Sequence, residues 1–277
     1  MGIVDSVRFR VDGLRRLLGK HVRGWLATIN DAPVFVLGNQ KSGTTAIAVL
    51  LAERTGHSVT WDPTSPQHDS LIVDIYQEAA SISTLVQQCE LAFSKDVVKD
   101  PNLTFVYDAL QERFPDAQFV MVMRDPRDNV RSILDRLDLP GDATSLDSER
   151  YEAMSQGWRL VVDGSWMGIQ GEHYIDSLAG RWQRAARIYL ENEDTFQLIR
   201  YEDFMDAKVA AIDGLAARLG LEAKHGIEDK VDQQFQPRGH RRDANWPTFF
   251  GESNLRRIEI RCAEEMNALG YDSFHTM

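Results

Sequence analysis

The sequence predicts an α/β fold, in which a central parallel β-sheet is covered by helices on both faces. Short apolar runs typical of buried strands alternate along the chain with segments in which apolar residues recur at helical spacing. Strands are predicted at residues 33–37, 58–61, 95–99, 118–123 and 195–199. Helices are predicted at residues 46–54, 72–91, 103–114 and 128–138. This alternation is typical of parallel strands joined by helical crossovers.

The individual elements differ in the strength of their signals. Residues 33–37 and 118–123 contain unbroken apolar runs and are the clearest strands, whereas residues 58–61 are a weaker candidate. Gly56 follows the first predicted helix in the position that favours a left-handed residue. Pro115 and the pair Pro140-Gly141 end two of the later helices.

Two regions depart from this alternation. Residues 1–30 carry six basic residues against two acidic ones, a balance of +4, which leaves −15 for the remainder of a chain whose net charge is −11. Apolar residues recur there at steps of three and four, so residues 1–30 are predicted to form an amphipathic helix. It either packs on the domain or makes weak peripheral contact with anionic lipid through residues 1–26. Residues 31–277 are expected to form one domain, within which residues 140–180, rich in glycine and aromatic residues, are predicted to be an irregular lid or binding insertion.

Composition excludes several classes of protein. The acidic net charge argues against general nucleic-acid binding, and no apolar run reaches the 18 residues of a spanning helix. The N-terminus lacks a signal-peptide apolar core. Cys89 and Cys262 stand far apart, which provides neither a disulfide framework nor a zinc site. We therefore expect a cytoplasmic protein.

A loop of small and polar residues connects the first strand to the first helix. It reads Gly38-Asn-Gln-Lys-Ser-Gly-Thr-Thr45. Backbone N–H groups of such a loop and of the following helix converge on one point, where the helix dipole adds positive potential. The lysine adds a full charge and the hydroxyls add further donors. The loop predicts a phosphate-binding site in a P-loop NTPase-like three-layer domain.

The position of Lys41 argues against a kinase or nucleotide hydrolase. Those proteins carry GxxxxGK[ST], with the lysine after the last glycine. Here Lys41 precedes Ser42-Gly43, and no acidic pair suited to Mg²⁺ is evident. A P-loop nucleotide kinase remains the alternative enzyme.

A second motif follows the strongest predicted strand and reads Met123-Arg-Asp-Pro-Arg-Asp-Asn-Val-Arg-Ser132. Arg124 at the strand end and Ser132 on the next helix can converge on one phosphate. The planar guanidinium suits this task because it binds phosphate oxygens in pairs.

Together the two motifs resemble those of the sulfotransferases that use 3′-phosphoadenosine-5′-phosphosulfate (PAPS). That family has [KR]-S-G-T-T at the 5′-phosphosulfate and R-[DN]-P-[RK]-D-x-x-x-S at the 3′-phosphate. The resemblance runs from about residue 33 to residue 271 and includes a final helix at residues 252–271. It implies transfer of a sulfuryl group from PAPS to a hydroxyl or amine, with 3′-phosphoadenosine-5′-phosphate (PAP) as product and no metal.

The resemblance implies roles for individual residues. The cofactor-binding residues would be Lys41, Ser42, Gly43, Thr44, Thr45, Arg124, Ser132, Tyr201, Arg238 and Gly239. Tyr201 would approach the adenine, although a core position for this side chain is equally open. Arg238-Gly239 would close over the 3′-phosphate, a role that Arg241 or Arg242 could take instead. Lys41 would also neutralise charge on the leaving oxygen.

The chain departs from the cytosolic phenol and steroid branch of the family. Ala46 replaces the adenine-stacking tryptophan, and Pro101 replaces the catalytic histidine. Carbohydrate and tyrosyl-protein sulfotransferases use a glutamate after the first helix, and the matching region here contains Asp62. The resemblance to this branch makes Asp62 the first candidate for the catalytic base and Asp100 the second.

Alternatives to these assignments stay open. His57 and His68 follow as candidates for the base, and Asp62 could instead cap the turn before Pro63. The acceptor is expected to be a small molecule or a glycan, such as a hydroxylated metabolite. A non-catalytic relative that binds a nucleotide or glycan is the alternative outside the enzymes.

Overall fold

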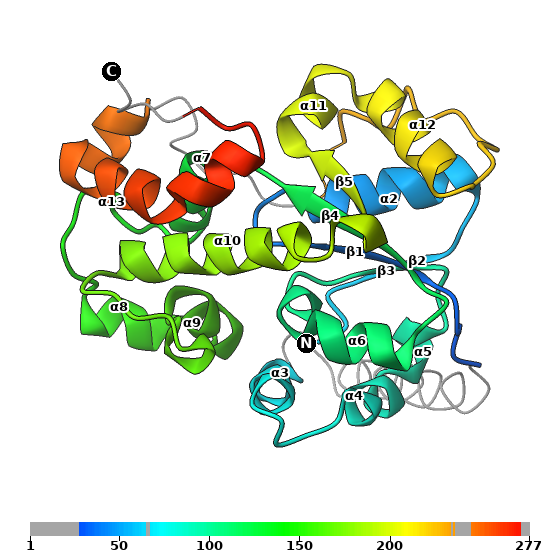
Figure 1. Cartoon of the computed structure of the whole chain (residues 1–277), viewed down its shortest axis with the longest axis horizontal. Coiled ribbons are helices and arrows are strands. Elements are labelled where there is room, and N and C mark those ends of the chain that lie inside the picture. Colours follow the sequence, from blue (N-terminus) through cyan, green and yellow to red (C-terminus); the bar gives the residue numbers. More distant parts are fainter. Residues whose placement is uncertain (1–27, 65–66, 234, 236–244, 273–277) are drawn as a thin grey trace, which may run out of the picture.

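The computed structural model describes residues 28–64, 67–233, 235 and 245–272. Within them, parallel strands form a sheet of order β2-β3-β1-β4-β5 (Figure 1). The strands are β1 (Val34–Gly38), β2 (Val59–Trp61), β3 (Val97–Lys99), β4 (Gln118–Met123) and β5 (Phe196–Arg200). All five lie within one or two residues of their predicted bounds, so the α/β prediction is confirmed.

The strand β1 lies in the middle of the sheet because it pairs on both sides. Val36 is in register with Lys99 on one side and with Val120 on the other. Gly38, the last residue of β1, is in register with Val122. Since the strands are parallel, their carboxyl ends meet at one edge, where parallel sheets bind ligands.

Alternate residues of β1 and β4 enter two separate cores, one on each face of the sheet. On one face Val36 and Val120 pack against α2 (Thr44–Thr55), α11 (Tyr201–Asp206) and α12 (Lys208–Arg218). On the other face Phe35 and Phe119 stack with ring centroids 5.5 Å apart. Figure 1 shows the helices between β2 and β4 on this second side. The period of two along each strand therefore produces the three-layer arrangement.

The chain between β2 and β4 contains more breaks than predicted. The predicted helix 72–91 is wrong, because the structure divides it into α3 (Asp69–Tyr76), α4 (Ile82–Gln88) and α5 (Glu90–Phe93). Glu78 adopts a φ of 60°, which ends the first helix, and the Ser81 hydroxyl caps the second by accepting from the Ser83 N–H. The predicted helix 103–114 begins as the 3₁₀ turn η1 (Leu103–Val106) and continues as α6 (Tyr107–Arg113).

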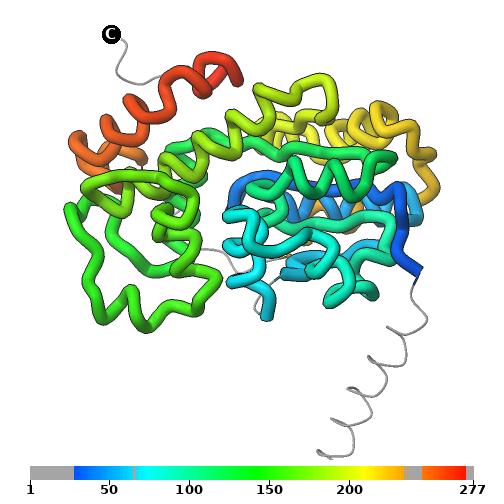
Figure 2. Tube along the Cα trace, turned by 60° about the horizontal axis from the view of Figure 1, so that its bottom comes forward, coloured from blue at the N-terminus to red at the C-terminus, as the bar shows by residue number. Residues whose placement is uncertain are grey.

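Residues 140–180 are largely helical, so the expectation of an irregular segment is wrong. They contain α8 (Ser148–Ala153), α9 (Gln156–Val162), η2 (Ser165–Met167) and the start of α10 (Tyr174–Leu190). In Figure 2 this green segment forms one end of the molecule, beside the cyan chain of α3. The Trp166 ring packs edge-on against Tyr76, and its Nε1 donates to the Leu160 carbonyl. Trp166 is thus a core residue.

Two helices complete the domain. The helix α7 (Pro126–Arg136) follows β4 and begins at Asp125, whose carboxylate accepts from the Arg127 N–H. The last helix, α13 (Trp246–Ala268), is kinked at Gly251, so its straight part begins where the final helix was expected. It packs against α10 through an ion pair of 2.6 Å between Arg187 and Glu265.

Some predictions fall outside the described residues. The N-terminal helix was predicted for residues 1–30, of which residues 1–27 are not described. The same holds for Arg238, Gly239, Arg241 and Arg242. In the part of the chain that is described, no helix is long and apolar enough to cross a membrane.

Candidate active site

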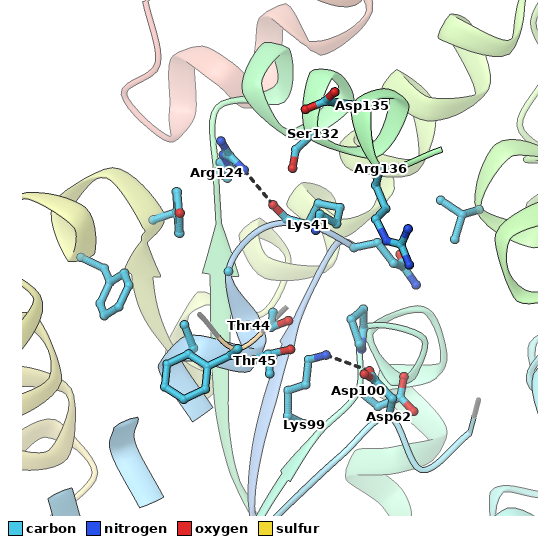
Figure 3. Close-up of a pocket in the computed structure, with 18 of the residues that line it drawn as sticks. Lys41, Thr44, Thr45, Asp62, Lys99, Asp100, Arg124, Ser132, Asp135 and Arg136 are labelled. Atoms are coloured by element: carbon cyan, nitrogen blue, oxygen red, sulfur yellow. Dashed lines mark hydrogen bonds and ion pairs between the residues drawn. The ribbon is translucent and has the colours of Figure 1, made fainter. Parts of the chain in front are cut away.

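A cavity of about 560 Å³ opens at the carboxyl edge of the sheet. Figure 3 shows the loop after β1 in the middle of it, with Arg124 and Ser132 on one side and Lys99, Asp62 and Asp100 on the other. The predicted site residues that line it are Lys41, Gly43, Thr44, Thr45, Asp62, Asp100, Arg124, Ser132 and Tyr201. The structure therefore brings together residues from five parts of the chain that were predicted separately from the sequence.

The loop needs glycine at two positions. Gly38 has a φ of 144°, and a Cβ there would lie 2.5 Å from the Val122 carbonyl oxygen. Gly43 has a φ of 95°, and a Cβ there would overlap the ring of Tyr201. Between them Lys41 also adopts the left-handed region, with a φ of 67°. Such strain in a non-glycine residue is found where a loop is held in shape by its surroundings.

The helix α2 begins at this loop without a side-chain cap. Gly43 occupies the N-cap position and offers no side-chain hydrogen bond, and Thr44 and Thr45 form the first turn. The first N–H groups of a helix have no intrahelical acceptor, and the dipole of a 12-residue helix places positive potential on them. This end of α2 is therefore suited to an anion.

Asn129 on α7 holds the loop through hydrogen bonds to the backbone and side chains of the loop. Its Nδ2 donates to the Gln40 carbonyl at 2.8 Å and to the Ser42 hydroxyl at 2.9 Å, while its Oδ1 accepts from Asn39 Nδ2 at 2.9 Å. The Ser42 side chain is thereby buried toward α7, and its N–H donates to the Asn39 carbonyl. Ser42 is therefore held as a support of the loop and is not among the residues that line the cavity.

Arg181 on α10 supports the loop through hydrogen bonds to two of its side chains. It is completely buried, and its guanidinium donates to Asn39 Oδ1 and to Gln40 Oε1, the latter at 2.9 Å from Nη2. It also lies 4.1 Å from the centroid of Phe105. Burial lowers the pKa of Arg181 to about 9, and this guanidinium remains charged at neutral pH. Arg181 was not predicted from the sequence because its partners lie some 140 residues away.

Arg124 lines the cavity and carries one donor that no described residue satisfies. Its Nη1 donates to the Lys41 carbonyl at 3.0 Å, and its guanidinium lies 4.6 Å from the centroid of Tyr201. Its Nε is buried and has no hydrogen-bond partner among the described residues. Burial lowers the pKa of Arg124. A buried N–H of a cation without an acceptor is a site at which an anion restores the missing bond.

The helix α7 adds further polar groups to the cavity. Ser132 faces the loop from this helix (Figure 3), and Arg131 and Arg136 also line the cavity. Arg131 pairs with Asp128 at 2.7 Å. Neither arginine was predicted from the sequence. The available signal was that Arg131 directly precedes Ser132 on a helix that starts at the sheet edge.

An ion pair marks the opposite wall of the cavity. Lys99 is 2% exposed, and its Nζ lies 2.7 Å from Asp62 Oδ1. The Asp62 side chain keeps 35% of its surface exposed, and its backbone adopts a φ of 51°. Its N–H donates to the Lys99 carbonyl at 2.7 Å. Asp62 is therefore fixed in position while one carboxylate edge stays open to the cavity.

Asp100 is more enclosed than Asp62. It is 1% exposed, and its oxygens accept from the Thr64 N–H, the Thr64 hydroxyl and the Asn102 N–H. Burial, and secondarily the nearby charge of Asp62, raises the pKa of Asp100 to about 6. Since its oxygens already hold three donors, the geometry favours Asp62 over Asp100 as the group that meets an acceptor.

The histidine candidates lie elsewhere. His57 Nδ1 is 2.7 Å from the Thr55 hydroxyl, and His68 stands at the N-terminus of α3. Neither is among the described residues that line the cavity. Asp69, directly after His68, does line the cavity. It was not predicted from the sequence, because acidic residues are common in the first turn of a helix. Among the described residues, no cluster of three His, Cys, Asp or Glu could hold a metal ion.

Comparison with known proteins identifies one family. A model described as "Sulfotransferase family" matches residues 53–225, which is more than half of the chain and begins after the loop at residues 38–45. None of the curated proteins searched matches the chain.

Solved structures share the fold at low identity. A sulfotransferase from Mycobacterium avium superposes with a TM-score of 0.52 at 12% identity, covering 93% of this chain and 81% of that one. A mouse sulfotransferase complexed with PAP gives 0.50 at 17% identity, covering 86% and 85%. One from Alicyclobacillus acidocaldarius gives 0.50 at 12%, covering 87% and 97%. These likenesses confirm the fold.

The enclosed carboxyl of Asp100 predicts a pH-dependent stability. Its folded pKa of about 6 lies above the usual 3.8, so its favourable contribution is present below pH 3.8 and is lost as the pH rises through 6. Relative to Asp100→Asn, the free energy of unfolding of the wild type should fall by about 2 kcal/mol between pH 4 and pH 7. Urea unfolding at several pH values measures this. The exposed control Asp108→Asn should give a constant difference from the wild type, and a constant difference for Asp100→Asn would contradict the assignment.

Proposed function

This chain belongs to the sulfotransferase family, and we propose that the cavity at the sheet edge is where it transfers a sulfuryl group from PAPS to an acceptor. The activity follows from the family. The observation that carries the location is the loop of residues 38–45, which the uncapped start of α2, Lys41 and Arg124 surround with donors and positive charge. The proposal extends to the residues that hold each partner.

The residues of the cavity fit a molecule with separate phosphate groups. The Nε of Arg124 lacks an acceptor among the described residues, and Ser132 faces the same space. We assign these two side chains to the 3′-phosphate of PAPS. The N–H groups of residues 43–45 and the side chain of Lys41 are assigned to the 5′ side. The mouse relative is complexed with PAP, and the same product is proposed to bind here.

Tyr201 is proposed to hold the adenine end of the nucleotide. Its ring packs on Gly43 and under the guanidinium of Arg124, so it is fixed against both phosphate-binding elements. Phe204 and Met205 continue the cavity wall in this direction. Arg238 and Gly239 remain proposed as the loop that closes over the 3′-phosphate.

The transfer itself requires little covalent chemistry from the protein. When bound, PAPS supplies the sulfuryl group. Asp62 accepts the proton of the acceptor hydroxyl or amine as the acceptor–sulfur bond forms. Lys41 neutralises the charge that grows on the phosphate oxygen as its bond to sulfur breaks. Lys99 is a positioning residue, because its ammonium holds Asp62 against the cavity. This division resembles in-line phosphoryl transfer, in which placement and charge stabilisation dominate.

The acceptor is proposed to be a small hydroxylated metabolite or a glycan. Gly157, Trp158 and Val161 of α9 line the cavity beside the carboxylates, which supports an acceptor-side role for residues 140–180. A P-loop nucleotide kinase is disfavoured by the family and by the position of Lys41. A non-catalytic relative is disfavoured by the open carboxylate of Asp62 beside the loop.

Ligand stabilisation tests the nucleotide assignment. PAP without metal should raise the melting temperature of the wild type, because a ligand at about 100 times its Kd adds about 2.7 kcal/mol. ATP with Mg²⁺ should leave it unchanged. Arg124→Ala should weaken PAP binding by about 1.5–3 kcal/mol, the range for hydrogen bonds to a charged group. The exposed control Arg256→Ala should bind PAP as the wild type does. Stabilisation by ATP with Mg²⁺ and not by PAP would overturn the proposed function.

Turnover tests the role of Lys41. Lys41→Met keeps the aliphatic stem and removes the charge. Its rate of [³⁵S]sulfuryl transfer from PAPS to the best acceptor of a broad panel should fall by about 10²–10³-fold, the loss expected for one group that stabilises transition-state charge. Circular dichroism should show an unchanged fold. A rate within about tenfold of the wild type would remove Lys41 from the reaction.

The base is tested separately. Asp62→Asn should lower kcat by about 10²–10⁴-fold, the usual contribution of general base catalysis, while the Kd for PAP stays near that of the wild type. Isothermal titration with PAP and steady-state kinetics measure the two quantities. If kcat is unchanged, the assignment of Asp62 is wrong and Asp100 becomes the candidate.

A further inference from the structure

The carboxylate of Asp69 is unusual among the acidic groups of the cavity. It is the first residue of α3, is 2% exposed and lines the cavity. Neither of its oxygens has a hydrogen-bond partner among the described residues. By contrast, Asp62 has Lys99, and Asp100 has three donors. A buried carboxylate without donors destabilises the protein unless something else supplies them.

The described residues around Asp69 hold it in place without donating a hydrogen bond to its carboxylate. Gly157 of α9 lies directly against it, since a Cβ on this glycine would lie 2.8 Å from Asp69 Oδ2. Trp158, the next residue, lines the same cavity. Burial raises the pKa of Asp69, while the neighbouring His68 lowers it. The contact between Asp69 and Gly157, which are 88 residues apart in the chain, therefore places a hydrogen-bond acceptor in a cavity that Trp158 also lines.

We propose that Asp69 binds a hydrogen-bond donor group of the sulfuryl acceptor, other than the group that is sulfated. The acceptor then carries at least two such groups, a hydroxyl or amine that receives the sulfuryl group and a second hydroxyl or ammonium that Asp69 binds. Polyols, amino sugars and amino alcohols have this chemistry, and monohydroxylated steroids and simple phenols lack it. The inference rests on the proposed function, because it uses the same cavity.

A purely structural role for Asp69 does not account for its contacts. The other buried carboxylates among the described residues have partners, as Asp125 has in the Arg127 guanidinium at 2.6 Å. A role as catalytic base is taken by Asp62, which Lys99 holds and which remains partly open. An acceptor group that donates to Asp69 would supply hydrogen bonds that no described residue makes to this carboxylate.

Two matched series of probes test the proposal by binding to the PAP-saturated protein. The first is 4-ethylphenol, 4-(2-hydroxyethyl)phenol and tyramine. The second is methyl 2-deoxyglucoside, methyl glucoside and methyl glucosaminide. Within each series the compounds differ at one position, which carries hydrogen, hydroxyl or ammonium. In at least one series the wild type should bind a hydroxyl or ammonium member roughly 10- to 100-fold more tightly than the hydrogen member. Which member binds best identifies the donor.

Three variants test whether Asp69 causes this binding preference. Asp69→Asn should reduce it to within about threefold and leave PAP binding unchanged. Gly157→Ala, which displaces the carboxylate without removing it, should weaken the same preference. Asp74→Asn, the same change at an exposed position of α3, should retain it.

Stability provides a readout that needs no acceptor. Asp69→Asn should leave the melting temperature of the ligand-free protein unchanged or raise it, because it removes an unpaired buried charge. Asp125→Asn, which breaks a buried ion pair, should lower it by roughly 5–10 °C. Three outcomes would each overturn the proposal. The first is equal or absent binding within both series, and the second is a preference that survives Asp69→Asn. The third is a loss of stability in Asp69→Asn like that of Asp125→Asn. If the wild type fails to bind PAP at all, the proposed function fails, which the stabilisation by PAP reports independently.

Discussion

The buried guanidinium of Arg181 is the interaction on which the geometry of the cavity depends. It reaches from α10 under the loop after β1 and donates to Asn39 and Gln40. Phe105 of η1 lies on its face. One side chain thus links the loop, the segment after β3 and the long helix that crosses the sheet. A cation in a fully buried position is stable only with such partners. The strained backbone of Lys41 persists because this support, together with Asn129, leaves the loop no other shape.

The cavity divides into two halves of different charge. Three arginines, Arg124, Arg131 and Arg136, outnumber Asp135 on the side of α7, where phosphate groups are assigned. Asp62, Asp69 and Asp100 gather on the side of α3 and α9, with Lys99 between them and the loop. This polarity separates the partners in space, because an anionic nucleotide is attracted to the first half and a donor-bearing acceptor to the second. The sulfuryl group would then cross the boundary between them.

Features that depend on neighbouring residues in the sequence were predicted more closely than features that depend on distant ones. The strands and the loop at residues 38–45 follow from local apolar runs and local glycines, so they were predicted closely. The helix α10 was missed although its apolar residues recur at helical spacing, from Ile175 through Leu178 to Trp182, so the sequence did carry its signal. The break at Glu78 depends on one backbone dihedral that propensity does not encode. Asp69 could not be found because its isolation arises only when α9 folds over it, and a sequence does not show the absence of a partner.

The central place of β1 has a consequence for the synthesis of the protein. A ribosome produces β1 and its loop early, yet the neighbours of β1 at residues 97–99 and 118–123 and the supporting Arg181 emerge much later. At translation rates of about 5–20 residues per second, the loop waits on the order of ten seconds for Arg181. Until β3 and β4 emerge, the apolar strand β1 has no sheet to join. The nascent chain therefore exposes an apolar strand to aggregation or chaperone binding until β4 leaves the exit tunnel.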